Sequence, residues 1–161
     1  MVTKSLILFT ASFVLLSFVK AQNRKADSTA IVAVFKSILA ACKENNPADP
    51  QIKIQGRFYK AAPYIVYRGA NKKRAWKDFV NYSNADEKTE TDAIGKRVNR
   101  TAGQDDNYTI TKYVTEKESE GTWHVLIVNY KAGGEDKKAA FAFLKIGNRF
   151  GLGDIEQDYK E

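Results

Sequence analysis

The sequence predicts an α+β protein in which three helices pack against a four-stranded antiparallel sheet. Up to Gly103, apolar residues recur at the three-and-four spacing of amphipathic helices. After Gly103 the pattern changes to alternation, with β-branched and aromatic residues between closely spaced turn signals. Links this short join antiparallel strands as hairpins. Helices followed by a meander of hairpins predict that the helices cover one face of a strongly twisted sheet.

The first residues have the pattern of an export signal. Lys4 supplies a positive start, residues 6–19 form an apolar run, and Ala21 ends a stretch of small or modest side chains suited to cleavage. The run is shorter than the about 20 apolar residues that span a membrane. We therefore expect a signal peptide at residues 1–21, a secreted or periplasmic protein, and no stable membrane anchor. The mature chain would have a flexible start at 22–27, one domain at 28–157 and a tail at 158–161.

Composition excludes several classes of function. The net charge of +7 includes Lys4 and Lys20, which would leave with the leader, and no stripe of basic residues points to nucleic acid as a partner. Cys42 is the only cysteine, so an internal disulfide is impossible, and its place on an apolar helix stripe is typical of a small buried hydrophobe. His124 is the only histidine, so a multi-histidine metal site is impossible. We expect no cofactor.

The helices are predicted from their apolar stripes and caps. The first begins at Asp27 or Ser28 as N-cap and ends before Pro47. Residues 72–82 predict a second helix, and residues 85–101 a third, capped by Ser83 or Asn84 and stopped by Gly103. Between the first two helices, residues 51–67 are ambiguous, with strand-like alternation at 52–54, a short helix at 58–62 ended by Pro63, and a β-prone stretch at 64–67.

The four strands are predicted at residues 108–116, 122–131, 138–146 and 149–156. The second of them has apolar residues on both faces. Trp123, Val125 and Ile127 point to one face, and His124, Leu126, Val128 and Tyr130 point to the other. Each face of the sheet must therefore be covered, which indicates either dimerisation through the outer face or a sheet curled around a pocket.

A family resemblance rests on three features: the order of elements, the segment APYIVYRG at 62–69 and the segment AAFAFLKIGNRFGLGDIE at 139–156. The chain resembles the nuclear transport factor two-like superfamily, in particular its small exported bacterial members of unassigned function, over roughly residues 28–156. The resemblance implies that the sheet is strongly curved into a cone-shaped roll closed by the helices, with a cavity that holds a small hydrophobic ligand, an active site or nothing. It also implies a homodimer through the sheet face. The stretch 51–57 departs from the family pattern, and the superfamily includes both enzymes and binders, so fold alone does not choose between them.

Three residues are candidates for catalysis. Asp154 follows Gly151 and Gly153 and shares strand parity with Phe150 and Leu152, so a cavity on that face would raise its pKa and make it a base. Tyr113 or Tyr67 would then donate the hydrogen bond to the substrate. The alternative for Asp154 is a strand-end carboxylate that accepts backbone, Lys or Arg hydrogen bonds. A half-buried histidine such as His124 is more often structural than catalytic.

The many aromatic side chains favour a pocket for an apolar or ring-shaped ligand, although most of them must fill the core. The residues predicted to line it are Tyr64, Tyr67, Trp76, Phe79, Tyr113, Tyr130, Phe143 and Asp154. The basic cluster at 72–77 favours a solvated helix face.

Three hypotheses for the function follow. The first is a non-catalytic exported module that binds a small apolar ligand or a protein partner. The second is a cofactor-free lyase, isomerase or hydrolase that uses Asp154 with a tyrosine; it requires Asp154 and His124 to face one water-poor cavity. The third is a cystatin-type inhibitor, which is weak because the chain has no Gln-x-Val-x-Gly hairpin.

Overall fold

The computed structural model describes residues 5–44, 58–67, 78–103 and 107–160. Outside these residues lie the strand-like stretch at 51–57, most of the predicted helix at 72–82 and the basic cluster at 72–77. The described helical elements are α1 (Ser5–Glu44), the 3₁₀ helix η1 (Tyr59–Tyr64), α2 (Ala85–Val98) and the π-helical turn η3 (Asn99–Gly103). The strands are β1 (Tyr108–Glu118), β2 (Gly121–Ala132), β3 (Glu135–Ile146) and β4 (Arg149–Gln157).

The four strands form one antiparallel sheet in the order β1-β2-β3-β4, so the predicted α+β class and the hairpin meander are confirmed. Each strand begins and ends within a few residues of its predicted bounds. Glycine provides the left-handed turn residues that the hairpins need, with φ of 62° at Gly133 and 59° at Gly147. The sheet is not strongly curled, so it does not itself close into a cone.

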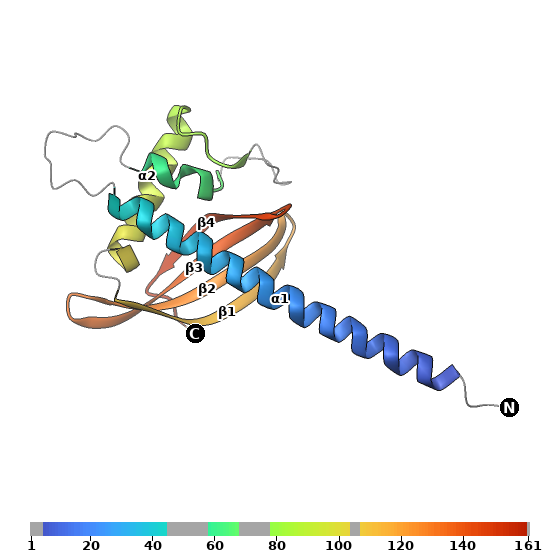
Figure 1. Cartoon of the computed structure of the whole chain (residues 1–161). Coiled ribbons are helices and arrows are strands. Elements are labelled where there is room, and N and C mark those ends of the chain that lie inside the picture. The colour runs from blue at the N-terminus through green and yellow to red at the C-terminus, as the bar shows by residue number, and fades with distance from the viewer. Residues whose placement is uncertain (1–4, 45–57, 68–77, 104–106, 161) are drawn as a thin grey trace, which may run out of the picture.

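The helix α1 crosses one face of the sheet, and its first half extends beyond the sheet (Figure 1). The prediction that this helix begins at Asp27 or Ser28 is wrong. No glycine or proline interrupts the chain between Ser5 and Glu44, so nothing stops the helix from running through residues 22–27. Ser28 donates a helical hydrogen bond to the carbonyl of Lys25 instead of capping a free end.

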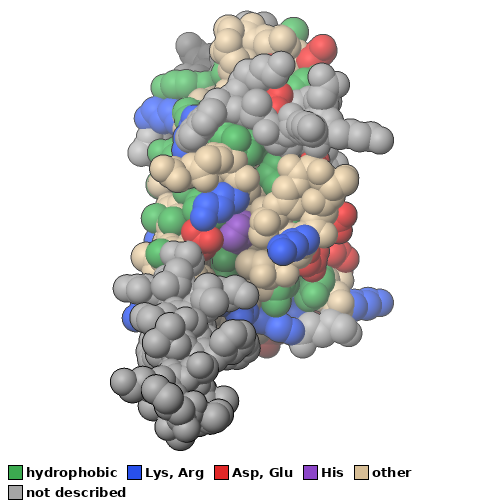
Figure 2. Space-filling view, turned by 90° about the vertical axis from the view of Figure 1, so that its right-hand side faces the viewer, with side chains coloured by type: hydrophobic (Ala, Val, Ile, Leu, Met, Phe, Trp, Pro, Cys, Tyr) green, Lys and Arg blue, Asp and Glu red, His purple; other side chains and the backbone are tan. Residues whose placement is uncertain are grey.

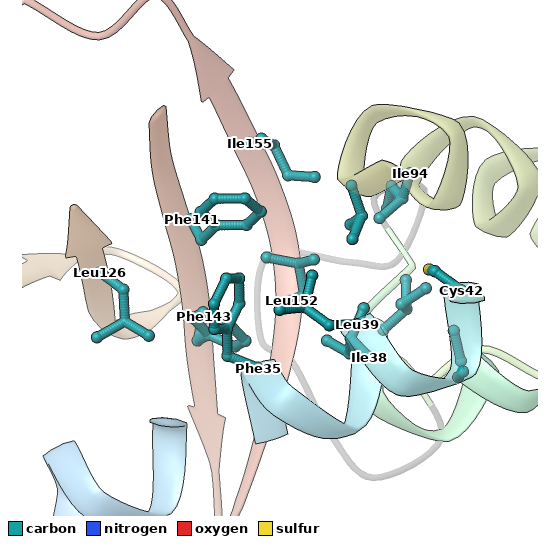
Figure 3. Close-up of a cluster of buried hydrophobic side chains, with 14 of the residues drawn as sticks. Phe35, Ile38, Leu39, Cys42, Ile94, Leu126, Phe141, Phe143, Leu152 and Ile155 are labelled. Atoms are coloured by element: carbon teal, nitrogen blue, oxygen red, sulfur yellow. The ribbon is translucent and has the colours of Figure 1, made fainter. Parts of the chain in front are cut away.

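The main core lies between α1, α2 and the inner face of the sheet (Figure 3). Phe35 of α1 meets Phe141 of β3 edge to face at 4.8 Å. Burying each such side chain contributes about 1.5–3 kcal/mol. Cys42 is buried in the same core, and burial raises the pKa of its thiol to about 12, as expected for a cysteine that serves as a small hydrophobe.

The chain itself covers much of the outer face of the sheet. Val125, Ile127 and Ala140 are buried there, and Tyr159 packs against them. A second cluster on that face consists of Val66, Phe79, Leu144 and Ile146, with Trp123 packed beside them. The two apolar faces predicted from β2 are therefore both covered within one copy of the chain.

The segment at 65–66 extends the sheet beyond β4. Ile65 pairs in parallel with Leu152, and Val66 pairs antiparallel with Phe79. The prediction of a helix at 72–82 is therefore wrong for residues 78–82, the part that the structure describes, because Phe79 forms a β-bridge. Backbone hydrogen bonds with residues 65–67, from Tyr67 to the carbonyl of Asp78 at 2.8 Å and from Val80 to the carbonyl of Ile65 at 2.9 Å, outweigh the helical period of this short segment. The third predicted helix is confirmed as α2, and the side chain of its N-cap Asn84 accepts hydrogen bonds from the amides of Asp86 and Glu87.

Candidate functional site

Tyr113 and His124 form a hydrogen-bonded pair on the inner face of the sheet. The register of β1 and β2 pairs Tyr113 with Leu126 and Thr115 with His124, so the two side chains are diagonal neighbours on the same face. The hydroxyl oxygen of Tyr113 lies 2.6 Å from Nδ1 of His124. The imidazole is 3% exposed. Two residues that the sequence proposed as separate candidates therefore form one unit.

The hydrogen bond can be assigned a direction. Burial lowers the pKa of His124, with Asp27 opposing and Lys145 adding to this effect, so the imidazole is neutral at pH 7. A distance of 2.6 Å is short for a bond donated by an imidazole N–H and lies within the range of bonds donated by a hydroxyl. We therefore assign Tyr113 as the donor and Nδ1 as the acceptor. The ring proton then resides on Nε2, which is buried and has no hydrogen-bond partner among the described residues.

Charged and aromatic side chains surround the pair. Asp27 of α1 accepts a hydrogen bond of 2.7 Å from the ammonium group of Lys145 on β3 and so ties the helix to the sheet. The ring of Phe150 lies 5.0 Å from the imidazole at 83°, and the guanidinium of Arg24 lies 5.9 Å from the centre of the Tyr113 ring. Figure 2 shows the histidine (purple) between acidic and basic side chains on this side of the molecule.

The electrostatics keep the pair in one protonation state. Burial raises the pKa of Tyr113, Asp27 raises it further, and Arg24 opposes them. The ordinary pKa values of tyrosine and histidine already make proton transfer from the phenol to the imidazole cost about 5 kcal/mol. Both shifts increase that cost, because they favour neutral imidazole and protonated phenol. The pair is therefore a positioned hydrogen-bonding unit and not a base prepared for proton transfer at neutral pH.

Tyr113 also forms part of the wall of an open groove between α1 and the edge strand β1. The groove has a volume of about 400 Å³, which is within the range of small-molecule sites. Its walls are Ser28, Thr29 and Val32 from α1, Ile110, Thr111, Lys112 and Tyr113 from β1, and Leu126 from β2. A hollow of about 510 Å³ at the other end of β2 and β3 is larger, but it is lined mainly by charged side chains such as Asp136, Lys137 and Asp158. The groove at α1 and β1 is therefore the better site for an apolar ligand.

Asp154 does not join this site. A β-bulge between β3 and β4 pairs Leu152 with Phe143 but Asp154 with Ala142, so Asp154 and Leu152 lie on opposite faces. The expected parity fails because the extra residue, Gly153, shifts the alternation by one. The carboxylate is about half exposed and accepts a hydrogen bond of 3.3 Å from Arg97. This environment corresponds to the alternative of a strand carboxylate paired with arginine.

The other residues predicted to line a pocket belong to the packing of the fold. Tyr130 and Phe143 are buried in the main core, and Tyr64 and Tyr67 pack against it. Phe79 lies in the outer-face cluster. Trp76 lies outside the described residues. Among the members of the aromatic set that the structure describes, Tyr113 alone lines the groove between α1 and β1.

The site residues that sequence reasoning missed include the polar residues Asp27, Ser28, Thr29 and Lys145 and the apolar groove residues Val32 and Ile110. Asp27 and Ser28 were considered only as helix caps, and no pattern marks Thr29 or Lys145 as part of a site. Their contribution depends on where α1 crosses the sheet, which only the tertiary structure reveals.

Within the described ranges, no three side chains of His, Cys, Asp or Glu gather where they could hold a metal ion. None of the helices searched there is both long and apolar enough to cross a membrane. Comparison of the chain with protein-family models, with curated proteins and with solved structures gives no match.

Proposed function

We propose that the protein is an exported, non-catalytic module that binds a small, largely apolar ligand in the groove between α1 and β1. The observation that supports it is the hydroxyl of Tyr113, which lies on the wall of the groove and is held in a fixed orientation by the buried His124. Val32 and Ile110 would contact the apolar body of the ligand. A polar group held rigidly beside apolar walls is the usual composition of a small-molecule site.

Catalysis has weaker support than binding. The lyase, isomerase or hydrolase hypothesis needs Asp154 and His124 in one cavity, but Asp154 is half exposed and paired with Arg97. The remaining pair would have to transfer a proton against a large difference in pKa. The cystatin-type inhibitor has no further observation in its favour.

The resemblance to the nuclear transport factor two-like superfamily remains part of this proposal. A helix packed on a four-stranded meander agrees with it. The three-helix form of the fold remains a proposal. Because the sheet is not strongly curled, a ligand would bind at the margin between α1 and β1 rather than inside a closed cone. Export rests on the leader pattern at residues 1–21. A homodimer through the sheet face is less well supported, because Val125, Ile127 and Ala140 are buried within one chain.

A fluorescent apolar probe tests the site. Phenylnaphthylamine, which is neutral and becomes brighter in apolar surroundings, should bind the purified protein. The substitution Thr29→Trp, on the wall of the groove, should block binding. Lys36→Trp places the same side chain at another exposed position of α1 and should leave binding unchanged. Fluorescence that does not rise, or that falls equally in both variants, would reject the groove as the binding site.

A further inference from the structure

The hydroxyl groups of the groove share one property: each of them donates its hydrogen to the protein itself. Ser28 and Thr29 donate to the carbonyl of Lys25, at 2.9 and 3.0 Å. Thr111 donates to the carbonyl of Ile127 at 3.3 Å. Tyr113 donates to Nδ1 of His124, as the length of that bond indicates.

A hydroxyl that donates its only hydrogen retains its lone pairs and can still accept hydrogen bonds. All four hydroxyl oxygens therefore offer acceptors to a ligand. His124 has a defined role in this arrangement, since its buried Nδ1 keeps the hydrogen of Tyr113 engaged. Among the described side chains that line the groove, only Lys112 carries an N–H donor, and it is exposed on the edge strand.

A positive charge near the groove disfavours a cationic ligand, and the lone pairs of its hydroxyl oxygens disfavour an anionic one. The carboxylate that acts on Tyr113 is Asp27, which is already paired with Lys145 at 2.7 Å. The guanidinium of Arg24 lies against the Tyr113 ring and would repel an ammonium group. A carboxylate ligand has only acceptor oxygens, and these would be repelled by the lone pairs of the hydroxyl oxygens in the groove.

We propose that the groove selects a neutral ligand with a hydrogen-bond donor on an apolar body, such as an alcohol or a phenol. This inference rests on the proposed function, because it gives the chemical class of the ligand for the same groove. The donor would bind to the oxygens of Thr29 and Tyr113, and the apolar body would lie along Val32 and Ile110.

Three probes that share one body test the selection: para-propylphenol, para-propylanisole and para-propylbenzoate. Binding is followed through the backbone amide signals of Val32 and Ile110 in NMR titrations of the purified protein. The phenol can donate a hydrogen bond, whereas the anisole and the benzoate cannot. We expect the phenol to bind at least about tenfold more tightly than the anisole, which corresponds to about 1.4 kcal/mol.

The substitution Thr29→Val removes one acceptor and preserves the shape of the side chain. It should weaken the phenol several-fold and leave the anisole unchanged. Thr89→Val is the matched control, because Thr89 makes the same type of helical hydrogen bond, to Ala85 at 2.9 Å on α2, and does not line the groove. The control should bind every probe as the unmodified protein does.

Each other outcome has a distinct meaning. Equal affinity for phenol and anisole would overturn the selection for donors and leave the groove as the site. Tighter binding of the benzoate would overturn it in favour of an anion site at Lys112 and Arg24. If no probe shifts the signals of Val32 and Ile110, both the site and its chemistry are refuted.

Discussion

Replacing Tyr113 by phenylalanine removes one oxygen and leaves the shape of the ring unchanged. Nδ1 of His124, in a side chain that is 3% exposed, then loses the donor that lies 2.6 Å away. Leaving a buried acceptor without its partner costs about 1–3 kcal/mol. Tyr113 lines an open groove, so water can reach part of the vacated space. We therefore expect Tyr113→Phe to lower the free energy of unfolding by about 1–2 kcal/mol.

A double-mutant cycle isolates this hydrogen bond from other effects. His124→Leu removes the other partner, and the double variant should lose less stability than the sum of the two single variants, by at least about 1 kcal/mol. The measurement is urea unfolding followed by circular dichroism at pH 7.5, where the imidazole is neutral. Tyr108→Phe is the control, because Tyr108 is on the same strand but its ring packs against Phe35. Single effects that add within about 0.5 kcal/mol would refute the coupling between Tyr113 and His124.

Three further predictions concern His124 and two glycines. Burial lowers the pKa of His124, so the unfolded chain takes up a proton before the folded protein does as pH falls below about 6.5. The free energy of unfolding, measured with urea, should therefore fall between pH 7.5 and 5.5, by up to about 1.4 kcal/mol per pH unit. His124→Gln should not show this fall. Gly95→Ala would place a methyl carbon 2.3 Å from the ring of Phe58, so it should destabilise the protein by about 1–3 kcal/mol in thermal unfolding, although alanine is normally the better helix former. Adding Phe58→Leu should recover part of the loss. A stabilised single variant would contradict the close packing of Gly95 against Phe58. Gly153→Ala would place its methyl 2.6 Å from the Trp123 ring and should shift the tryptophan fluorescence, whereas an unchanged spectrum would contradict that contact.

The strands and α2 could be predicted from the sequence because their signals are local. Alternation of side chains and short turns at Gly133 and Gly147 determine the meander, and an Asn84 cap with acidic residues in the first turn determines the start of α2. The face of His124 followed from counting alternate residues along β2, and it lies on the inner face with Tyr130 as predicted. These features need no knowledge of distant contacts.

Features that depend on distant contacts were missed. The bulge at Gly153 moves Asp154 off the inner face, and a run of alternating residues does not show where one extra residue enters the pairing. Phe79 has the spacing of a helix stripe, but it pairs with Val66 beside the open edge of β4. The groove depends on Ser28 and Thr29 lying opposite β1, which is decided by the packing of α1 across the sheet.

The protonation of His124 is the most direct test of the account, because the orientation of the Tyr113 hydroxyl and the acceptor character of the groove both depend on it. The chain has one histidine, so labelling that residue with ¹⁵N gives a single pair of imidazole nitrogen signals. At pH 7.5, long-range ¹H–¹⁵N NMR should show Nδ1 as the unprotonated, acceptor nitrogen and Nε2 as the protonated one. A protonated Nδ1 would reverse the hydrogen bond to Tyr113 and contradict the account.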